Sequence, residues 1–252
     1  MDILAIILIA FLIAVLFSIL GLGGAIIYTP LFFWLGIPLL AAITMALFLN
    51  MITTTSASIT YLKQQLVDKR IAIPMIFTSI IGAFAGSYLA YRVETRFIIL
   101  LLSVILLIAA LRILLLKNIG FTIKDGDNKK IMVGTGLAFI IGIISSLVGI
   151  GGGTFIVPLL LILGLEIKNA IATSSFIITF MSLSGFAGHL FFGTQTIGML
   201  DVRVLFYAGM AAFSGAQIGS KIIFKRVSSK NLGNLFAIVL LFVAGKLLYG
   251  LL

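Results

Sequence analysis

Long apolar runs separated by short polar stretches make up most of the chain. No Asp, Glu, Lys or Arg occurs over residues 3–62, 131–165 or 169–200. Uninterrupted apolar runs of about 18 residues or more are typical of membrane-spanning helices. The pattern therefore predicts an all-α, polytopic membrane protein and excludes a water-soluble globular domain. The predicted helical segments are 3–20, 24–36, 39–62, 72–91, 97–116, 131–148, 153–164, 168–190, 201–220 and 231–250.

Two of these segments, 24–36 and 153–164, are too short to cross a membrane. At about 1.5 Å per residue the longer of them spans roughly 20 Å, whereas the hydrocarbon core is about 30 Å thick. Each begins at a cluster of glycines and contains a proline, Pro30 or Pro158. We therefore expect two short helices, interrupted or re-entrant, that open at the glycine clusters.

The glycine clusters belong to an internal repeat. Residues 21–31, Gly-Leu-Gly-Gly-Ala-Ile-Ile-Tyr-Thr-Pro-Leu, align with residues 149–159, Gly-Ile-Gly-Gly-Gly-Thr-Phe-Ile-Val-Pro-Leu, at an offset of 128. Apolar matches carry little weight in so apolar a chain, but the shared Gly-x-Gly-Gly-x5-Pro-Leu pattern is specific. We expect two five-helix membrane repeats, residues 1–116 and 131–252, joined by a cytoplasmic loop at 117–130.

The basic residues indicate how the repeats are oriented. If each repeat crosses the membrane an odd number of times, 13 of the 17 Lys and Arg fall on one side, whereas four crossings divide them about 10 to 7. Short cytoplasmic loops collect Lys and Arg. The uneven division predicts inverted repeats in the plasma membrane, with both termini outside the cytoplasm. The net charge of +10 then reflects topology, and we expect the lipid bilayer as a partner and no nucleic acid.

Inverted repeats with interrupted helices are typical of secondary transporters, whose sites lie near mid-membrane between the repeats. A helix N-terminus exposes unpaired N–H groups and carries partial positive charge. Two such ends facing each other would bind a small anion with backbone alone. The alternative is that the glycines only permit close helix packing. The candidate residues are Gly21, Gly23, Gly24, Ala25, Gly149, Gly151, Gly152, Gly153 and Thr154.

Polar side chains on the segments after the glycine clusters could add donors to this site. The candidates are Asn50, Thr53, Thr54, Thr173, Ser174 and Ser175. The alternative for each hydroxyl is an ordinary hydrogen bond to another helix or to its own preceding turn. His189, the single histidine, could titrate near neutral pH, but its place late in its segment predicts an interfacial position. A coupling proton or other ion is left open.

With these motifs the chain resembles the sulfite exporter TauE/SafE family of membrane permeases. The resemblance rests on the two glycine clusters and on the polar run 172–175, and it covers nearly the whole chain. It implies a secondary transporter, acting as an exporter, of a small sulfur-containing anion such as sulfite or an organosulfonate. Alternatives are an anion channel and a carrier for a non-sulfur organic anion. We expect no enzyme activity, no cofactor and no metal.

Overall fold

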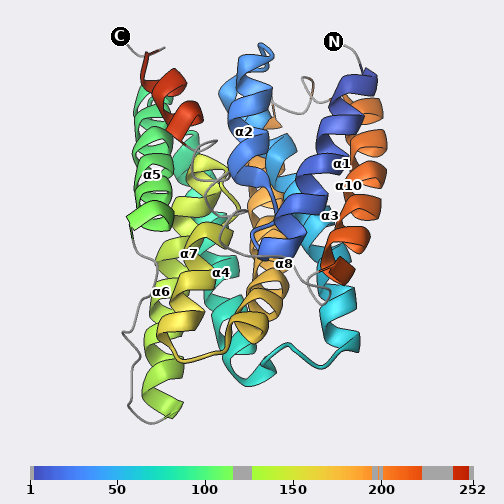
Figure 1. Ribbon diagram of the computed structural model, residues 1–252. Coiled ribbons are helices and arrows are strands. Elements are labelled where there is room, and N and C mark those ends of the chain that lie inside the picture. Colours follow the sequence, from blue (N-terminus) through green and yellow to red (C-terminus); the bar gives the residue numbers. More distant parts are fainter. Residues whose placement is uncertain (1–2, 116–126, 195–197, 199–200, 223–240, 250–252) are drawn as a thin grey trace.

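The computed structural model describes residues 3–115, 127–194, 198, 201–222 and 241–249, and within them the protein is a bundle of α-helices (Figure 1). The helices are α1 (Ile3–Leu20), α2 (Ala25–Trp34), α3 (Leu39–Lys63), α4 (Lys69–Ala90), α5 (Thr95–Leu115), α6 (Asp127–Val148), α7 (Gly153–Ile162), α8 (Ile167–Phe192) and α10 (Val202–Ile222). Residues 241–249 are also helical. The rest of the predicted last segment lies outside the described residues.

The helices fall into long and short classes, as the hydropathy pattern predicts. Among the described residues, four helices are long and apolar enough to cross a membrane: α3, α4, α8 and the 131–148 part of α6. In contrast, α2 and α7 have ten residues each. Ten residues reach about 15 Å, half the thickness of the hydrocarbon core. The prediction of two short helices after the glycine clusters is confirmed.

Some helices begin at polar residues, a few positions before the start that hydropathy predicts. The helix α4 begins at Lys69, earlier than predicted, because the Asp68 carboxylate accepts hydrogen bonds from the N–H groups of Arg70 (3.0 Å) and Ile71 (3.3 Å). Such a cap pairs N–H groups that have no partner within the helix. The helix α6 begins at Asp127, inside the predicted linker, whose residues 117–126 lie outside the described part of the chain.

The two halves of the chain pack across one another rather than side by side as separate units. The most extensive contacts join α4 to α6 and α1 to α10, and α3 also packs against α8. At the α4–α6 contact, a Cβ on Gly82 or Gly86 would overlap with the backbone carbonyl of Phe139 or Ile143. Small residues allow membrane helices to approach this closely. These glycines therefore set how tightly the halves are joined.

Gly86→Ala is expected to destabilise the bundle, whereas Gly136→Ala should stabilise it slightly. At position 86 the added methyl group meets the Ile143 backbone, and overpacking of this kind costs about 1–3 kcal/mol. At position 136, also in a helix, nothing lies within 4 Å, and alanine favours a helix by about 1 kcal/mol over glycine. Thermal unfolding in one detergent compares the two midpoints. Equal midpoints would contradict the close α4–α6 contact.

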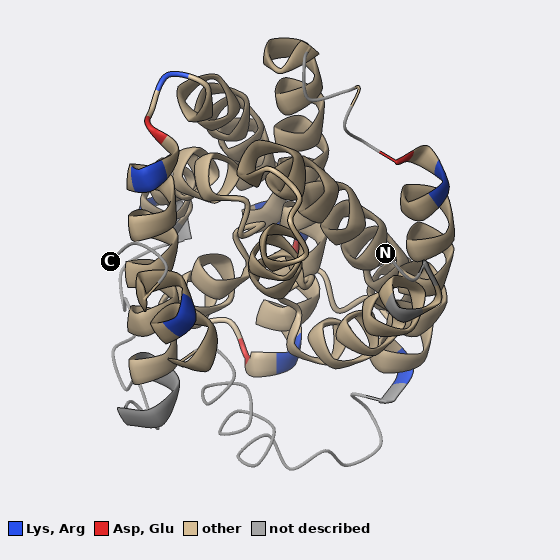
Figure 2. Cartoon of the chain, turned by 90° about the horizontal axis from the view of Figure 1, so that it is seen from above, with Lys and Arg blue, Asp and Glu red and all other residues tan. Residues whose placement is uncertain are grey.

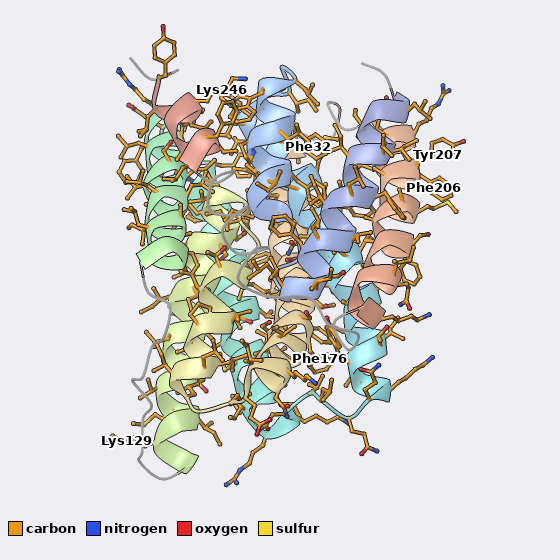
Figure 3. The ribbon with its side chains drawn as sticks, viewed as in Figure 1. Phe32, Lys129, Phe176, Phe206, Tyr207 and Lys246 are labelled. Atoms are coloured by element: carbon orange, nitrogen blue, oxygen red, sulfur yellow. The ribbon has the colours of Figure 1, made fainter. Side chains whose placement is uncertain are left out.

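The bundle has two distinct ends. The helix α1 begins at the upper end in Figure 1, where the 241–249 helix also lies. Lys246 is at this upper end and Lys129 is at the lower end (Figure 3). The connection between α3 and α4 is at the lower end as well. Seen along the bundle in Figure 2, charged residues are few against the uncharged ribbon.

Candidate functional site

Each short helix begins at a glycine-rich turn. The φ angles of the glycines in this turn are positive, a conformation that other residues rarely adopt. The φ angles are 68°, 88° and 117° at Gly21, Gly23 and Gly24, and 74°, 77° and 77° at Gly149, Gly151 and Gly152. A residue with a side chain loses about 1–2 kcal/mol in this left-handed region, which glycine enters freely. Gly24 and Gly152 are the N-caps of α2 and α7. The backbone itself therefore requires glycine at matching places in the two clusters.

The two short helices leave their turns toward opposite ends of the bundle. Figure 1 shows α2 in the upper part and α7 lower down. The last residue of α2, Trp34, lies 4.3 Å from Lys246 Nζ, measured to the ring centroid. Leu163, which follows α7, lies against Gly134 in the half of α6 that leads to the lower end. The N-termini of α2 and α7 therefore lie inside the bundle, between its ends.

Asn50 of α3 touches both glycine turns. Its Oδ1 accepts a 2.9 Å hydrogen bond from the backbone N–H of Ala25, the first residue of α2. Its Nδ2 donates a 2.7 Å hydrogen bond to Ser182 Oγ on α8. A Cβ on Gly23 or on Gly151 would overlap with this amide group. The two clusters, 128 residues apart in sequence, are thus neighbours on either side of one side chain.

Each glycine turn also packs against the long helix that follows the other turn. Gly21 lies against Ile171 of α8, and Gly149 lies against Ile43 of α3. The two isoleucines are separated by the same 128 residues (43 to 171) as the glycines that they contact. This glycine–isoleucine contact of the first turn is therefore found again, with the halves exchanged, at the second.

Hydrogen bonds tie the turns together across the two halves. The Gly149 carbonyl accepts a 2.5 Å bond from Thr29 Oγ1 on α2. The Gly21 carbonyl accepts a 3.0 Å bond from Ser174 Oγ on α8. Gly153, at the start of α7, lies directly against the Leu22 backbone. The residues around both turns therefore form one connected and buried region.

The hydroxyl groups predicted as donors have different surroundings. Thr53 and Thr54 donate 2.8 Å hydrogen bonds to the carbonyls of Leu49 and Asn50, one turn earlier in their own helix. Thr173 Oγ1 accepts a 3.0 Å bond from the Asp68 N–H, at the lower end of α4. Ser175 Oγ is buried without a hydrogen-bond partner among the described residues. Back-bonding, the alternative interpretation, therefore describes the two threonines of α3.

Three serines near the turns are absent from the predicted site residues. Ser182 pairs with Asn50. Ser145 Oγ lies 3.1 Å from the position of a Cβ on Gly152, and it and Ser146 Oγ are buried without a partner in the described part of the chain. Ser145 and Ser146 directly precede the second glycine cluster in sequence, and this adjacency was the available signal. Ser182 shares a helical face with Ser175, and this spacing was its signal in the sequence, whereas its pairing with Asn50 was visible only in the structure.

His189 lies near the end of α8 and is enclosed by neighbouring helices. Its side chain is fully buried, and Nε2 lies 2.9 Å from the Ser146 carbonyl oxygen. Its ring centroid is 5.6 Å from that of Tyr91. The neighbouring Gly188 lets Ser87 of α4 come close, so the end of α4 covers this part of α8. Such burial depends on contacts with residues as far as 98 positions away in sequence, such as Tyr91.

The region around the turns is polar but carries no full charge. In the described residues, no Asp, Glu, Lys or Arg side chain is buried. The available groups are amides, hydroxyls and backbone, with the partial positive charge of two helix N-termini. Groups of these kinds can donate hydrogen bonds to a small anion, and among the described residues no buried carboxylate would repel one.

A helical bundle with several membrane-length helices and a buried, uncharged polar centre defines a multi-pass membrane protein. The chain belongs to the sulfite exporter TauE/SafE family, whose profile matches residues 6–247. It is 26% identical to "Probable membrane transporter protein YunE" of Bacillus subtilis, with 92% of each chain covered. It is 25% identical to a probable membrane transporter protein of Methanocaldococcus jannaschii, covering 90% of this chain and 88% of that one.

A third relative, "Probable membrane transporter protein ORF9" of a Sinorhizobium species, is 27% identical, with 84% of this chain and 79% of its own covered. No solved structure matches the chain significantly. Family membership makes this protein a membrane transporter and not an enzyme.

Proposed function

We propose that the protein is a secondary transporter that exports a small sulfur-containing anion, such as sulfite or an organosulfonate. The observation that carries this proposal is the meeting of two half-length helix N-termini at Asn50, in a region where none of the described charged side chains is buried. The family description supplies the class of anion and the direction. The anion site would lie between the two glycine turns, near mid-membrane.

Two inverted repeats would account for the opposite directions of α2 and α7. The helix contacts support this arrangement: α4 packs against α6 and α8, while α10 packs against α1 and α3. Gly215 and Gly219 of α10 approach the carbonyls of Phe11 and Val15 on α1, much as the glycines of α4 approach α6. The contacts of α4 with α6 and α8 thus correspond to those of α10 with α1 and α3, as a two-fold axis between the halves would require.

Backbone N–H groups at the two turns would hold the anion. The Ala25 N–H already binds a neutral oxygen, Asn50 Oδ1, in the place that an oxyanion oxygen would take. A charged oxygen in this place gains a charge-assisted hydrogen bond, which is roughly twice as strong as a neutral one. The proposed site comprises the predicted residues, namely Gly21, Gly23, Gly24, Ala25, Asn50, Thr53, Thr54, Gly149, Gly151, Gly152, Gly153, Thr154, Thr173, Ser174 and Ser175. Thr53 and Thr54 would line it without donating to the anion, since their hydroxyls donate to their own helix.

Displacement of the Asn50 amide would link anion binding to movement. The amide joins Ala25 of α2 to Ser182 of α8, and so it bridges the two halves of the chain. When an anion takes over the Ala25 N–H, this bridge loosens and one repeat can rock against the other. Rocking of repeats around a fixed central site is the usual form of alternating access.

The end of the bundle that holds Lys129 would face the cytoplasm, with both termini outside, in the plasma membrane. The α3–α4 connection at this end is flanked by Lys63, Lys69 and Arg70, and short cytoplasmic loops collect such residues. Fusion of a periplasm-active or cytoplasm-active reporter to each terminus measures the orientation. Cytoplasmic signals from both termini would contradict it.

In proteoliposomes, sulfite or an organosulfonate should show saturable uptake and counterflow, whereas simple carboxylates should compete weakly. The reason is that sulfite and sulfonates present three oxygens that share the negative charge to the N–H groups of both turns, whereas a carboxylate presents two. The measurement is a competition screen with labelled sulfite against sulfate, thiosulfate, methanesulfonate and acetate. Unitary currents without counterflow would indicate a channel, and preferential carboxylate uptake would indicate a carrier for organic anions.

A further inference from the structure

A second polar region lies beside the second glycine turn and is centred on His189. We propose that His189 is the proton-binding residue that couples proton movement to anion transport, an inference that rests on the transport function proposed above. The region lies where α6 ends and α8 passes close to it. It is separate from the Asn50 amide, because the two side chains share no hydrogen bond among those of the described residues.

The hydrogen bond between the His189 ring and the Ser146 carbonyl determines which ring nitrogen can take up an additional proton. The Ser146 carbonyl oxygen can only accept, so Nε2 of His189 carries the hydrogen of this 2.9 Å bond. Nδ1 is then the basic nitrogen of the neutral ring. It is buried and has no hydrogen-bond partner among the described residues. A proton taken up by this ring therefore binds at Nδ1.

Further unpaired polar groups lie between His189 and the start of α7. Ser146 Oγ lies 2.8 Å from the position of a Cβ on Gly185, one turn before His189, and Ser145 Oγ lies 3.1 Å from that on Gly152. Neither hydroxyl has a hydrogen-bond partner within the described residues. Buried polar groups are nearly always paired, and exceptions gather at functional places. These hydroxyls give a proton at His189 a polar route toward the second turn.

The helices α3, α4, α6, α7 and α8 carry a single carboxylate, Asp127 at the lower start of α6, and Glu94, in the turn after α4, is exposed. Tyr91, directly after α4, donates a 3.1 Å hydrogen bond from its hydroxyl to the His189 backbone carbonyl. The next residue, Arg92, lies over the Tyr88 ring. The helices α3 and α6 carry their charged residues at their lower ends, and α7 carries none. A protonated His189 would thus be a buried cation without a counter-charge from the protein.

An anion at the glycine turns would supply this missing counter-charge. Proton and anion then favour each other's binding, and the coupling is reciprocal. Each ligand is expected to raise the affinity of the other by about tenfold, within the common range for coupled sites. Such a carrier is reversible, so export of an accumulated anion takes protons out with it.

The test uses proteoliposomes that contain a pH dye and are loaded with methanesulfonate, which stays ionised throughout the working range. Methanesulfonate efflux through the wild-type protein should raise the internal pH. His189→Gln should retain methanesulfonate exchange but lose the pH change, because a Gln amide can still donate to the Ser146 carbonyl and cannot hold a proton. Tyr91→Phe is the matched control, since it removes a neighbouring hydroxyl and leaves the His189 ring, and it should keep the pH change.

The outcomes separate this proposal from the one on which it rests. Methanesulfonate efflux without a pH change in the wild type, or a full pH change in His189→Gln, would overturn the proton site and leave the transporter proposal standing. If neither methanesulfonate nor sulfite moves, the transporter proposal itself fails. If only sulfite moves, the same variants are compared with sulfite as the substrate. Sulfite can carry a proton itself, but this contribution to the pH change is the same in the wild type and in every variant.

A second variant covers the case in which His189→Gln does not fold. Changing Ser145 and Ser146 together to Ala removes both hydroxyls and keeps the carbonyl that binds His189. This double variant should slow the pH change more than it slows methanesulfonate exchange. An equal effect on both, or no effect on either, would contradict the proton route.

Discussion

Gly23→Ala should abolish anion transport, whereas Gly36→Ala should leave most of it intact. The two glycines have almost the same φ, 88° and 86°, so both substitutions carry a similar backbone strain of about 1–2 kcal/mol. They differ in their surroundings, because a Cβ on Gly23 overlaps with the Asn50 amide and nothing lies within 4 Å of one on Gly36. The alanine at 23 must therefore displace Asn50, and such overpacking adds about 1–3 kcal/mol.

Counterflow of labelled sulfite at equal protein density compares the two variants, with membrane fractions showing that both are inserted. Gly151→Ala is the reciprocal test, because its Cβ meets the same amide from the other half of the chain. It should match Gly23→Ala in loss of counterflow. Similar rates in Gly23→Ala and Gly36→Ala would show that contact with Asn50 does not matter for transport.

The helices were largely predictable because membrane insertion leaves a strong one-dimensional signal. Apolar length alone separates α3 and α8 from the short α2 and α7, and the glycines before each short helix mark its start. The start of α4 was not predictable from hydropathy, since it depends on the Asp68 carboxylate at the edge of the apolar run. Polar capping residues therefore set helix ends that differ by a few residues from those that hydropathy predicts.

The candidate site was predictable in its backbone and much less so in its side chains. The repeat pattern identifies both glycine turns because a left-handed backbone conformation usually requires glycine, and glycine is visible in the sequence. It does not show that Thr53 bonds to its own helix while Asn50 bridges to Ser182, because a helical face has no fixed partner until other helices pack on it. The burial of His189 depends in the same way on the close approach of α4.

Asn50→Asp should block anion transport while the protein stays folded. The carboxylate can keep both hydrogen bonds of the amide, since one oxygen accepts from the Ala25 N–H and the Ser182 hydroxyl can turn and donate to the other. Its charge is also favourable at the N-terminus of α2, by about 0.3–1 kcal/mol. The same charge repels an incoming anion: at 4 Å and an effective dielectric constant near 20 this costs about 4 kcal/mol.

Such a penalty corresponds to roughly a thousandfold loss of affinity. Asn50→Ala is the matched comparison, because it leaves the Ala25 N–H unpaired, at a cost of about 1–3 kcal/mol in stability, without adding charge. If Asn50 lies at an anion site, Asp is the more stable variant by thermal unfolding and the poorer one in sulfite counterflow. If Asn50 only joins helices, stability and counterflow fall together and Ala is worse in both. The opposite order of the two variants in the two measurements therefore distinguishes an anion site from a structural bridge.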